Sequence, residues 1–253
     1  MKRLFLFTIF IFCFIRPGLC EDKWQEYRSL HFLIYYKDAP RDFVEAVQES
    51  AEDYYQEITQ ELGFTREKSW SFDERAKIYI YRDSDDYIKS GQADWSHGAA
   101  IAKEKTIRTF PQASGFFDTT LPHELGHIIF REFVGFRSNI PLWMDEGVAM
   151  YQEKAKRWGA NQAVRGAISQ GAFVPVPELT DVQRVEKDFV PLFYAESASL
   201  VYYLITEFGK YKFVSLCKML KGGTRFENAF IETYSRFKDF KDVNDSWLDY
   251  LNQ

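Results

Sequence analysis

Cysteine is scarce in this 253-residue chain, and its placement excludes one kind of stabilisation. Cys13 and Cys20 both lie in the first twenty residues, so a chain that loses this segment keeps Cys217 alone. An intramolecular disulfide is then impossible. Cys217 lies within an apolar helical pattern, and we interpret it as a core residue.

A stripe of lysine and arginine interleaved with aromatic residues is also missing. Removal of residues 1–20 would take away three of the 32 basic residues and none of the 37 acidic ones, which leaves a formal net charge of −8. Because nucleic-acid binding depends on clustered positive charge, nucleic acid is not expected as a partner. The 46% hydrophobic and 18% aromatic content argues against disorder. The length of 253 residues is sufficient for one large globular domain or for two small ones with a shared core.

Residues 1–20 have the features of an export signal. Lys2 and Arg3 precede the apolar run Leu4–Ile15, and Gly18 to Cys20 offers small residues for cleavage. The apolar run is short for a membrane span. We expect a cleaved signal and a secreted or periplasmic mature protein without a stable membrane span; an uncleaved anchor through residues 1–20 is the alternative.

Hydrophobic periodicity divides the remaining chain near residue 135. The first part alternates between patterns typical of strands, at 31–36, 76–81, 97–102 and 106–110, and of helices, at 41–62 and after a cap at Asp83 or Ser84. The second part is helical, with patterns at 141–151, 161–169, 191–208, 210–221, 224–237 and 241–252, and a proline-rich linker or crossing loop at 173–178. We expect one α+β domain over residues 21–253, with an α/β subdomain (21–135) followed by a helical subdomain (136–253).

The strongest chemical signal is the HExxH pattern from His123 to His127. It lies on a helix that we expect to be capped by Thr119 or Thr120, with Pro122 in its first turn, and to end at Gly135.

Residues four apart share a helix face, so the two imidazoles can bind one metal ion. Glu124 is rotated by about 100° from His123. That rotation places it beside the metal, where it can accept a proton from water. The alternative is a surface helix that carries two histidines by chance, but this helix is apolar and follows strand-like segments.

A catalytic zinc site generally has three protein ligands and an open position. No histidine follows His127, and the position where metzincins carry a third histidine is Phe133. The third ligand is therefore a carboxylate, or it is His31 or His97 from upstream.

The segment Trp143 to Ala149 (WMDEGVA) resembles the W-x-x-E-G-x-A segment of gluzincin zinc metallopeptidases and peptidase MA-like domains. The resemblance implies a zincin-like fold, in which a small mixed β-sheet and the HExxH helix precede a mostly helical part, and one Zn²⁺ per chain. It also implies that Glu146 is the third ligand. Asp145 is the competing carboxylate, although it points about 100° away on a helix. Glu153 matches a glutamate that orients a ligand in the family; the alternative is an exposed helix charge.

The stretch from Tyr194 to Leu204 is similar to the Y-x-x-x-x-x-L-x-x-Y-L stretch of gluzincin aminopeptidases. The similarity implies that Tyr194 donates a hydrogen bond to the developing oxyanion. The alternative is that Tyr194 is one more core tyrosine.

Gly98 to Ala102 (GAAIA) occupies the place of the G-x-M-E-N strand of aminopeptidases. Gly98, Ala99 and Ala100 are therefore expected to pair with the substrate backbone. Ile101 stands where that family carries a glutamate that anchors a free amine, although Glu104 is close in sequence. His97, beside this strand, is either a substrate contact or a structural histidine.

These features together predict an exported zinc metallopeptidase that acts on a peptide or protein substrate, with Glu124 as general base. The missing amine anchor favours an endopeptidase over an aminopeptidase. The alternative is a non-catalytic zinc-binding scaffold of the cell envelope derived from a peptidase. The intact Glu124 argues against it, because a purely structural site has no need of a general base.

Overall fold

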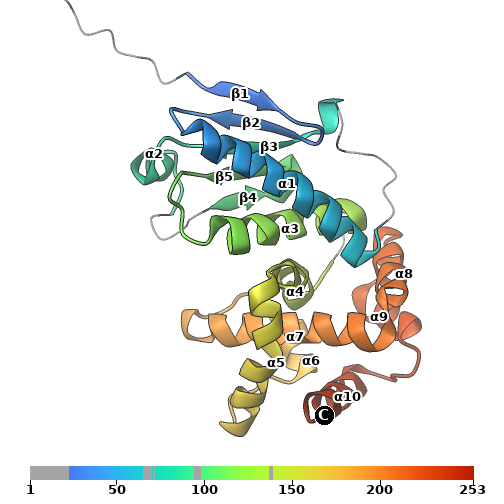
Figure 1. Cartoon of the computed structure of the whole chain (residues 1–253). Helices are drawn as coiled ribbons and strands as arrows, with labels where there is room; N and C mark the ends of the chain where they lie inside the picture. The colour runs from blue at the N-terminus through green and yellow to red at the C-terminus, as the bar shows by residue number, and fades with distance from the viewer. Residues whose placement is uncertain (1–22, 65–69, 71, 94–97, 137–138) are drawn as a thin grey trace, which may run out of the picture.

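The computed structural model describes residues 23–64, 70, 72–93, 98–136 and 139–253. A β-sheet with its helices forms one half of the molecule, and a group of helices forms the other (Figure 1). The expected export signal at residues 1–20 and His97 lie outside the described residues.

The sheet has five strands in the order β1-β2-β3-β5-β4. The strands are β1 (Gln25–Arg28), β2 (Phe32–Tyr36), β3 (Ala76–Ile80), β4 (Ala99–Ile101) and β5 (Thr106–Thr109). β2, β3 and β5 run parallel to one another, while β1 and β4 pair antiparallel at the two edges. The sheet is therefore small and mixed, as the resemblance to gluzincins implied.

Strand β1 was not expected from the sequence. Its four residues, QEYR, are mostly exposed, so they carry no alternation of apolar and polar side chains. Pairing with β2 makes this segment a strand.

Helix α1 (Arg41–Leu62) lies across the sheet (Figure 1) and ends before Gly63, as predicted. Its buried residues recur every three or four positions, which is the spacing of one helix face. The short helix α2 (Ser84–Lys89) is capped by Asp83, whose side chain accepts a hydrogen bond from the backbone N–H of Asp86.

Helix α3 (Leu121–Val134) carries the HExxH residues and ends before Gly135, but its start differs from the prediction. Neither Thr119 nor Thr120 caps it. A π-helical turn at Phe116–Thr120 runs directly into α3, and Thr120 has helical dihedrals with no capping hydrogen bond. The buried side chain of Phe116 holds this additional turn against the core, so a cap is not needed.

The second half contains seven α-helices within the described residues. They are α4 (Leu142–Gln152), α5 (Lys154–Ser169), α6 (Val176–Asp181), α7 (Val190–Phe208), α8 (Lys210–Lys221), α9 (Phe226–Thr233) and α10 (Phe240–Leu251).

Three of the predicted boundaries in this half were wrong. Helix α5 begins at Lys154 rather than at residue 161, because its first turns are largely exposed and show no apolar face. The expected linker at 173–178 contains the start of α6, where Pro175 precedes the first turn. Helix α9 ends at Thr233, before residue 237.

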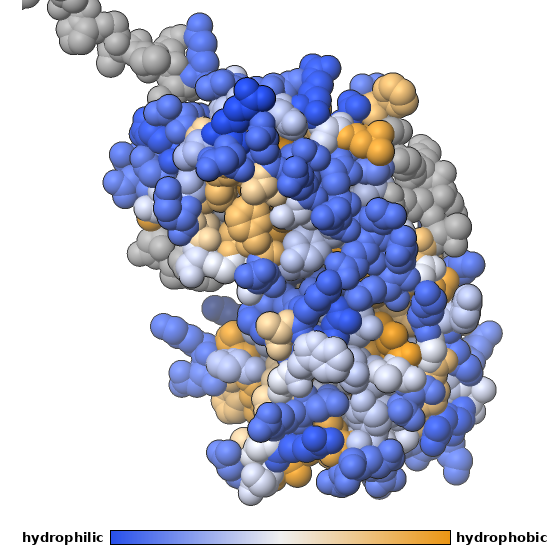
Figure 2. Space-filling view, viewed as in Figure 1, coloured by the Kyte–Doolittle hydropathy of each residue, from blue (hydrophilic) through white to orange (hydrophobic). Residues whose placement is uncertain are grey.

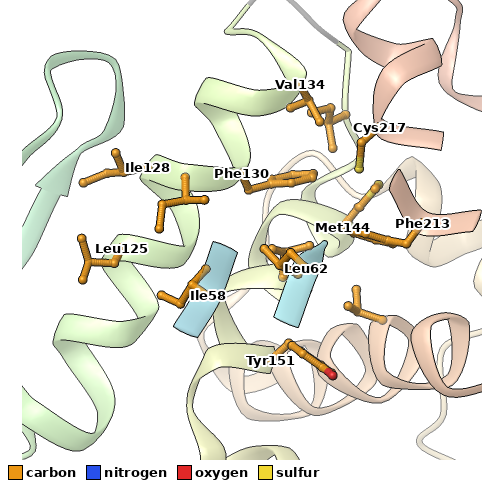
Figure 3. Close-up of a cluster of buried hydrophobic side chains, with 14 of the residues drawn as sticks. Ile58, Leu62, Leu125, Ile128, Phe130, Val134, Met144, Tyr151, Phe213 and Cys217 are labelled. Carbon is orange, nitrogen blue, oxygen red and sulfur yellow. The ribbon is translucent and has the colours of Figure 1, made fainter. Parts of the chain in front are cut away.

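One hydrophobic core connects the two halves. Figure 3 shows Ile58 and Leu62 of α1 beside Leu125 and Ile128 of α3, with side chains of the helical half on the other side. The latter include Met144 and Tyr151 of α4, and Phe213 and Cys217 of α8. Cys217 is fully buried, in agreement with its interpretation as a core residue.

Within the described residues, the stretch Lys187–Phe208, which includes α7, is long and apolar enough to cross a membrane by length and composition. Half of its apolar window is buried inside the protein, and α7 packs against α4 and α5. We interpret α7 as a core helix of the fold.

Candidate metal centre and cleft

Three side chains from two neighbouring helices converge at the junction of the two halves. The Nε2 atoms of His123 and His127, both on α3, lie 3.2 Å apart. Oε2 of Glu146, on α4, lies 3.6 Å from the first of these nitrogens and 3.5 Å from the second. The three ligand atoms therefore form a nearly equilateral triangle.

This triangle has the size that a small divalent ion requires. Tetrahedral ligands at about 2.1 Å from zinc lie about 3.4 Å from one another. The three side chains are 17 to 19% exposed, so their ligand atoms are not sealed from the cleft. Two imidazoles and a carboxylate suit zinc, and three protein ligands leave a coordination position open.

Two glycines allow α3, α4 and α7 to approach closely enough to build the triangle. A Cβ atom at Gly126, between the two histidines, would lie 3.0 Å from the Cα of Ala149 in α4. A Cβ atom at Gly147, next to Glu146, would lie 2.4 Å from the backbone oxygen of Ser197 in α7. Because glycine has no side chain, the helix backbones can approach closely at these two positions.

Each histidine has a carboxylate on its other ring nitrogen. Oε1 of Glu153 lies 2.8 Å from Nδ1 of His123, and Oδ1 of Asp145 lies 3.4 Å from Nδ1 of His127. Carboxylates in these positions hold a proton on Nδ1 and leave Nε2 free to bind a metal.

Glu153 does not share a face of α4 with Glu146. Helix α4 ends at Gln152, and Glu153 is the single residue between α4 and α5. Its side chain is 2% exposed, so the alternative of an exposed helix charge was wrong. The other carboxylate oxygen of Glu153 pairs with Nζ of Lys156 at 2.7 Å.

Asp145 lies beside Nδ1 of His127, on the side of the ring away from the triangle, and forms an ion pair with Arg131. Nη2 of Arg131 donates to Oδ2 of Asp145 at 2.7 Å, and Nε donates at 3.0 Å. Of the two competing carboxylates, Glu146 therefore completes the triangle. Arg131 was missed in the sequence, although its position four residues after His127 places it on the same face of α3.

His31, an open alternative for the third ligand, is occupied elsewhere. Its Nδ1 lies 2.5 Å from Oε2 of Glu52, whose other oxygen accepts a hydrogen bond from the hydroxyl of Ser29 at 2.6 Å. This cluster joins the turn between β1 and β2 to α1.

The triangle opens into a cleft of about 790 Å³. Gly98, Ala99 and Ala100 line it from the β4 side and Tyr194 of α7 lines it from the other half, with Glu124 also at the cleft. Figure 2 shows the surface indented between the two halves. Arg131, Phe136 and the residues from Gly91 to Ala93, which sequence reasoning did not single out, also line the cleft.

The electrostatics of the site favour a bound cation. Burial alone would raise the pKa of Glu146, but hydrogen bonds to His123 and His127 lower it to about 2. Glu146 is therefore ionised at neutral pH. Burial raises the pKa of Glu124 above its ordinary value, as expected for a carboxylate that exchanges protons. Burial, followed by the charge of Glu146, raises the pKa of Tyr194 to about 12, so its phenol keeps its proton.

Comparison with known proteins gives two results. A sequence model of the peptidase MA superfamily matches residues 65–253 of the chain. Among solved structures, the fold is similar to that of yeast LTA4 hydrolase in complex with bestatin, with a TM-score of 0.53 and 15% sequence identity. The similarity covers 88% of this chain and 39% of that chain, so this chain spans well under half the length of the hydrolase. A search of curated proteins finds no match. The predicted zincin-like α+β fold is confirmed.

Proposed function

Because the chain belongs to the peptidase MA superfamily, we propose that it is an exported zinc-dependent peptidase that cleaves within peptide chains. The observation that carries the proposal is the triangle of His123, His127 and Glu146. Its ligand atoms lie 3.2 to 3.6 Å apart, close to tetrahedral spacing, at a cleft that Glu124 also lines. Export is proposed from the character of residues 1–20, with an uncleaved anchor as the alternative.

His123, His127 and Glu146 would hold the zinc ion. When bound, zinc would polarise the attacking water and the scissile carbonyl. The carboxylates of Glu153 and Asp145 would keep the two imidazoles oriented with Nε2 toward the ion.

Glu124 acts as the general base. A carboxylate oxygen of Glu124 accepts a proton as the water oxygen attacks the scissile carbon, and Glu124 later passes this proton to the leaving amine nitrogen. The raised pKa of Glu124 suits both steps, since the group must gain and lose a proton in one cycle. The phenol of Tyr194 donates a hydrogen bond to the oxyanion, whose charge develops in the transition state.

Strand β4 would bind the substrate backbone. It is an edge strand of the sheet, and Ala99 and Ala100 line the cleft. An extended peptide can therefore add to this edge. Among the described residues that line the cleft, the carboxylates are Glu124, Asp145 and Glu146, each of which already has a role. Within this described part of the lining, no further carboxylate anchors a free amino terminus, and on that ground we propose internal cleavage.

The test compares Glu124→Gln with Glu104→Gln, which removes an exposed carboxylate outside the cleft lining. The substrate is a library of internally quenched peptides blocked at both ends, and zinc content is measured in parallel. Glu124→Gln should keep its zinc and lose activity by about 10²- to 10⁴-fold, while Glu104→Gln should match the wild type.

Full hydrolysis by Glu124→Gln would contradict the assignment of the base. A wild-type protein that binds zinc but cleaves no peptide would favour the alternative of a zinc-binding scaffold. Cleavage of peptides with a free amino terminus and not of blocked ones would make the enzyme an aminopeptidase.

A further inference from the structure

Arg131 of α3 lies where the cleft at the metal centre meets a second cavity. It lines the cleft, and it also lines a cavity of about 620 Å³ between the start of α4, the end of α6 and the start of α9. No other described residue lines both. Arg131 follows His127 by four residues, which places it about 6 Å further along α3. A substrate that extends from the metal in this direction therefore meets its side chain.

The guanidinium of Arg131 has two hydrogen-bonding edges, and Asp145 occupies one of them. The N–H donors of arginine lie in one plane, so Nε and Nη2 form one fork and Nη1 and Nη2 form another. Asp145 accepts from Nε at 3.0 Å and from Nη2 at 2.7 Å, which fills the first fork.

The second fork is open to the cleft. Among the described residues, no side chain or carbonyl accepts a hydrogen bond from Nη1 of Arg131. Nη1 is also not one of the described buried atoms that lack a partner, so it reaches solvent. The whole side chain is 20% exposed and lines the cleft. A group bound in the cleft can therefore contact Nη1 directly.

The open fork matches a second carboxylate. Two parallel N–H donors on a planar cation suit the two oxygens of a carboxylate, and such charge-assisted hydrogen bonds are about twice as strong as neutral ones. A backbone carbonyl or an amide has one acceptor oxygen and no charge, so it gains less. Among the described residues that line the cleft, Arg131 is the only arginine or lysine.

The position of Arg131 decides which part of a substrate it reaches. Helix α3 runs beside β4, the strand proposed to pair with the substrate backbone (Figure 1). An extended peptide advances about 3.3 Å per residue, so the 6 Å from His127 to Arg131 corresponds to about two residues. The reachable side chain therefore lies about two positions from the scissile bond, on one side of it.

We propose that Arg131 binds a carboxylate of the substrate about two residues from the scissile bond, through Nη1 and Nη2. This inference rests on the proposed peptidase function and names a determinant of its specificity. The carboxylate can belong to an aspartate or glutamate side chain within the peptide, or to the carboxyl terminus of a short peptide. Arg131 then has two partners, which are Asp145 and the substrate.

The test measures kcat/KM on internally quenched peptides that are blocked at both ends and differ only in glutamate or glutamine at one position. That position is moved along both sides of the cleaved bond. The variants are Arg131→Met, Arg131→Lys and the control Lys103→Met, which removes an exposed positive charge outside the cleft lining. The ratio of the two kcat/KM values within one enzyme cancels any general loss of activity, including a loss caused by displacement of Asp145.

We expect the wild type to prefer glutamate about tenfold at one position, about two residues from the bond. Arg131→Met should abolish this preference, and Lys103→Met should keep it. Arg131→Lys should keep only part of it, because lysine has no planar fork. Equal ratios in the wild type and Arg131→Met, at every position and at the carboxyl terminus, would overturn the proposal. If circular dichroism shows that Arg131→Met does not fold, the comparison of Arg131→Lys with the wild type decides.

The source of the carboxylate is identified by peptides that end about two residues beyond the bond, in a free acid or in an amide. Preference for the free acid assigns the fork to a chain terminus. Preference for glutamate inside blocked peptides assigns it to an acidic side chain.

Direct binding separates this proposal from the peptidase function. Fluorescence anisotropy measures the affinity of Glu124→Gln, with and without Arg131→Met, for labelled glutamate and glutamine peptides. A glutamate preference that needs Arg131, in a protein whose wild type cleaves no peptide, would keep the carboxylate site and refute the peptidase function. Cleavage without any such preference would refute the site alone.

Discussion

Replacing Gly147 by alanine tests whether the close approach of α4 and α7 builds the metal centre. The new Cβ would lie 2.4 Å from the backbone oxygen of Ser197 and 2.7 Å from Cγ2 of Val201. Because non-bonded atoms settle near 3.5 Å, α4 would have to move by roughly 1 Å. Overpacking of this kind costs about 1 to 3 kcal/mol, while alanine gains about 0.5 to 1 kcal/mol in helix propensity. The net loss in unfolding free energy should be about 1 to 2 kcal/mol.

The matched control is Gly159→Ala. Gly159 lies inside α5, and a Cβ there would meet nothing within 4 Å. This variant therefore receives the propensity gain alone and should be about 0.5 to 1 kcal/mol more stable than the wild type. Urea denaturation of the zinc-free proteins measures both changes.

The same substitution should weaken metal binding, because Glu146 precedes Gly147 and moves with α4. Competition with a chelator should show about a tenfold or greater loss of zinc affinity in Gly147→Ala and none in Gly159→Ala. If the two variants were equally stable and bound zinc equally, the contact between α4 and α7 would not determine the geometry of the site.

Three further outcomes follow from the site and the buried carboxylates. Tyr194→Phe should lower kcat by about 10²-fold with little change in KM, as measured on quenched peptides; a change confined to KM would contradict the role in oxyanion binding. Glu153→Ala should weaken zinc binding by about 10- to 100-fold in chelator competition, because His123 loses the carboxylate on Nδ1; unaltered affinity would rule out this orienting role.

The third outcome concerns Glu196 of α7. Burial raises its pKa from 4.5 to about 7 in the folded protein. The folded protein therefore binds this proton more tightly than the unfolded chain does. The unfolding free energy should therefore fall by about 3 kcal/mol as pH rises from 4.5 to above 7. Glu196→Gln should lack this part of the pH dependence in urea denaturation, and an unchanged pH profile would refute it.

Local patterns in the sequence were sufficient for several parts of the molecule. The apolar spacing in residues 41–62 and the glycine after it predicted α1, because a helix face and a helix end both depend on neighbouring residues. The spacing of His123 and His127 predicted that both imidazoles face the same way, since this follows from helix geometry alone. Resemblance to gluzincins singled out Glu146, Glu153 and Tyr194.

Contacts between distant segments decided the rest. Strand β1 has no pattern of its own and exists through pairing with β2, while the π-helical turn before α3 depends on the burial of Phe116. Periodicity requires Asp145 and Glu146 to diverge by about 100°, but it does not say which one faces the histidines. The rotation of α4 against α3 and α7 settles that choice, and this rotation depends on backbone contacts at Gly126 and Gly147. These contacts join residues that are far apart in the chain. Hydrophobic periodicity describes only a few neighbouring turns, so it could not predict them.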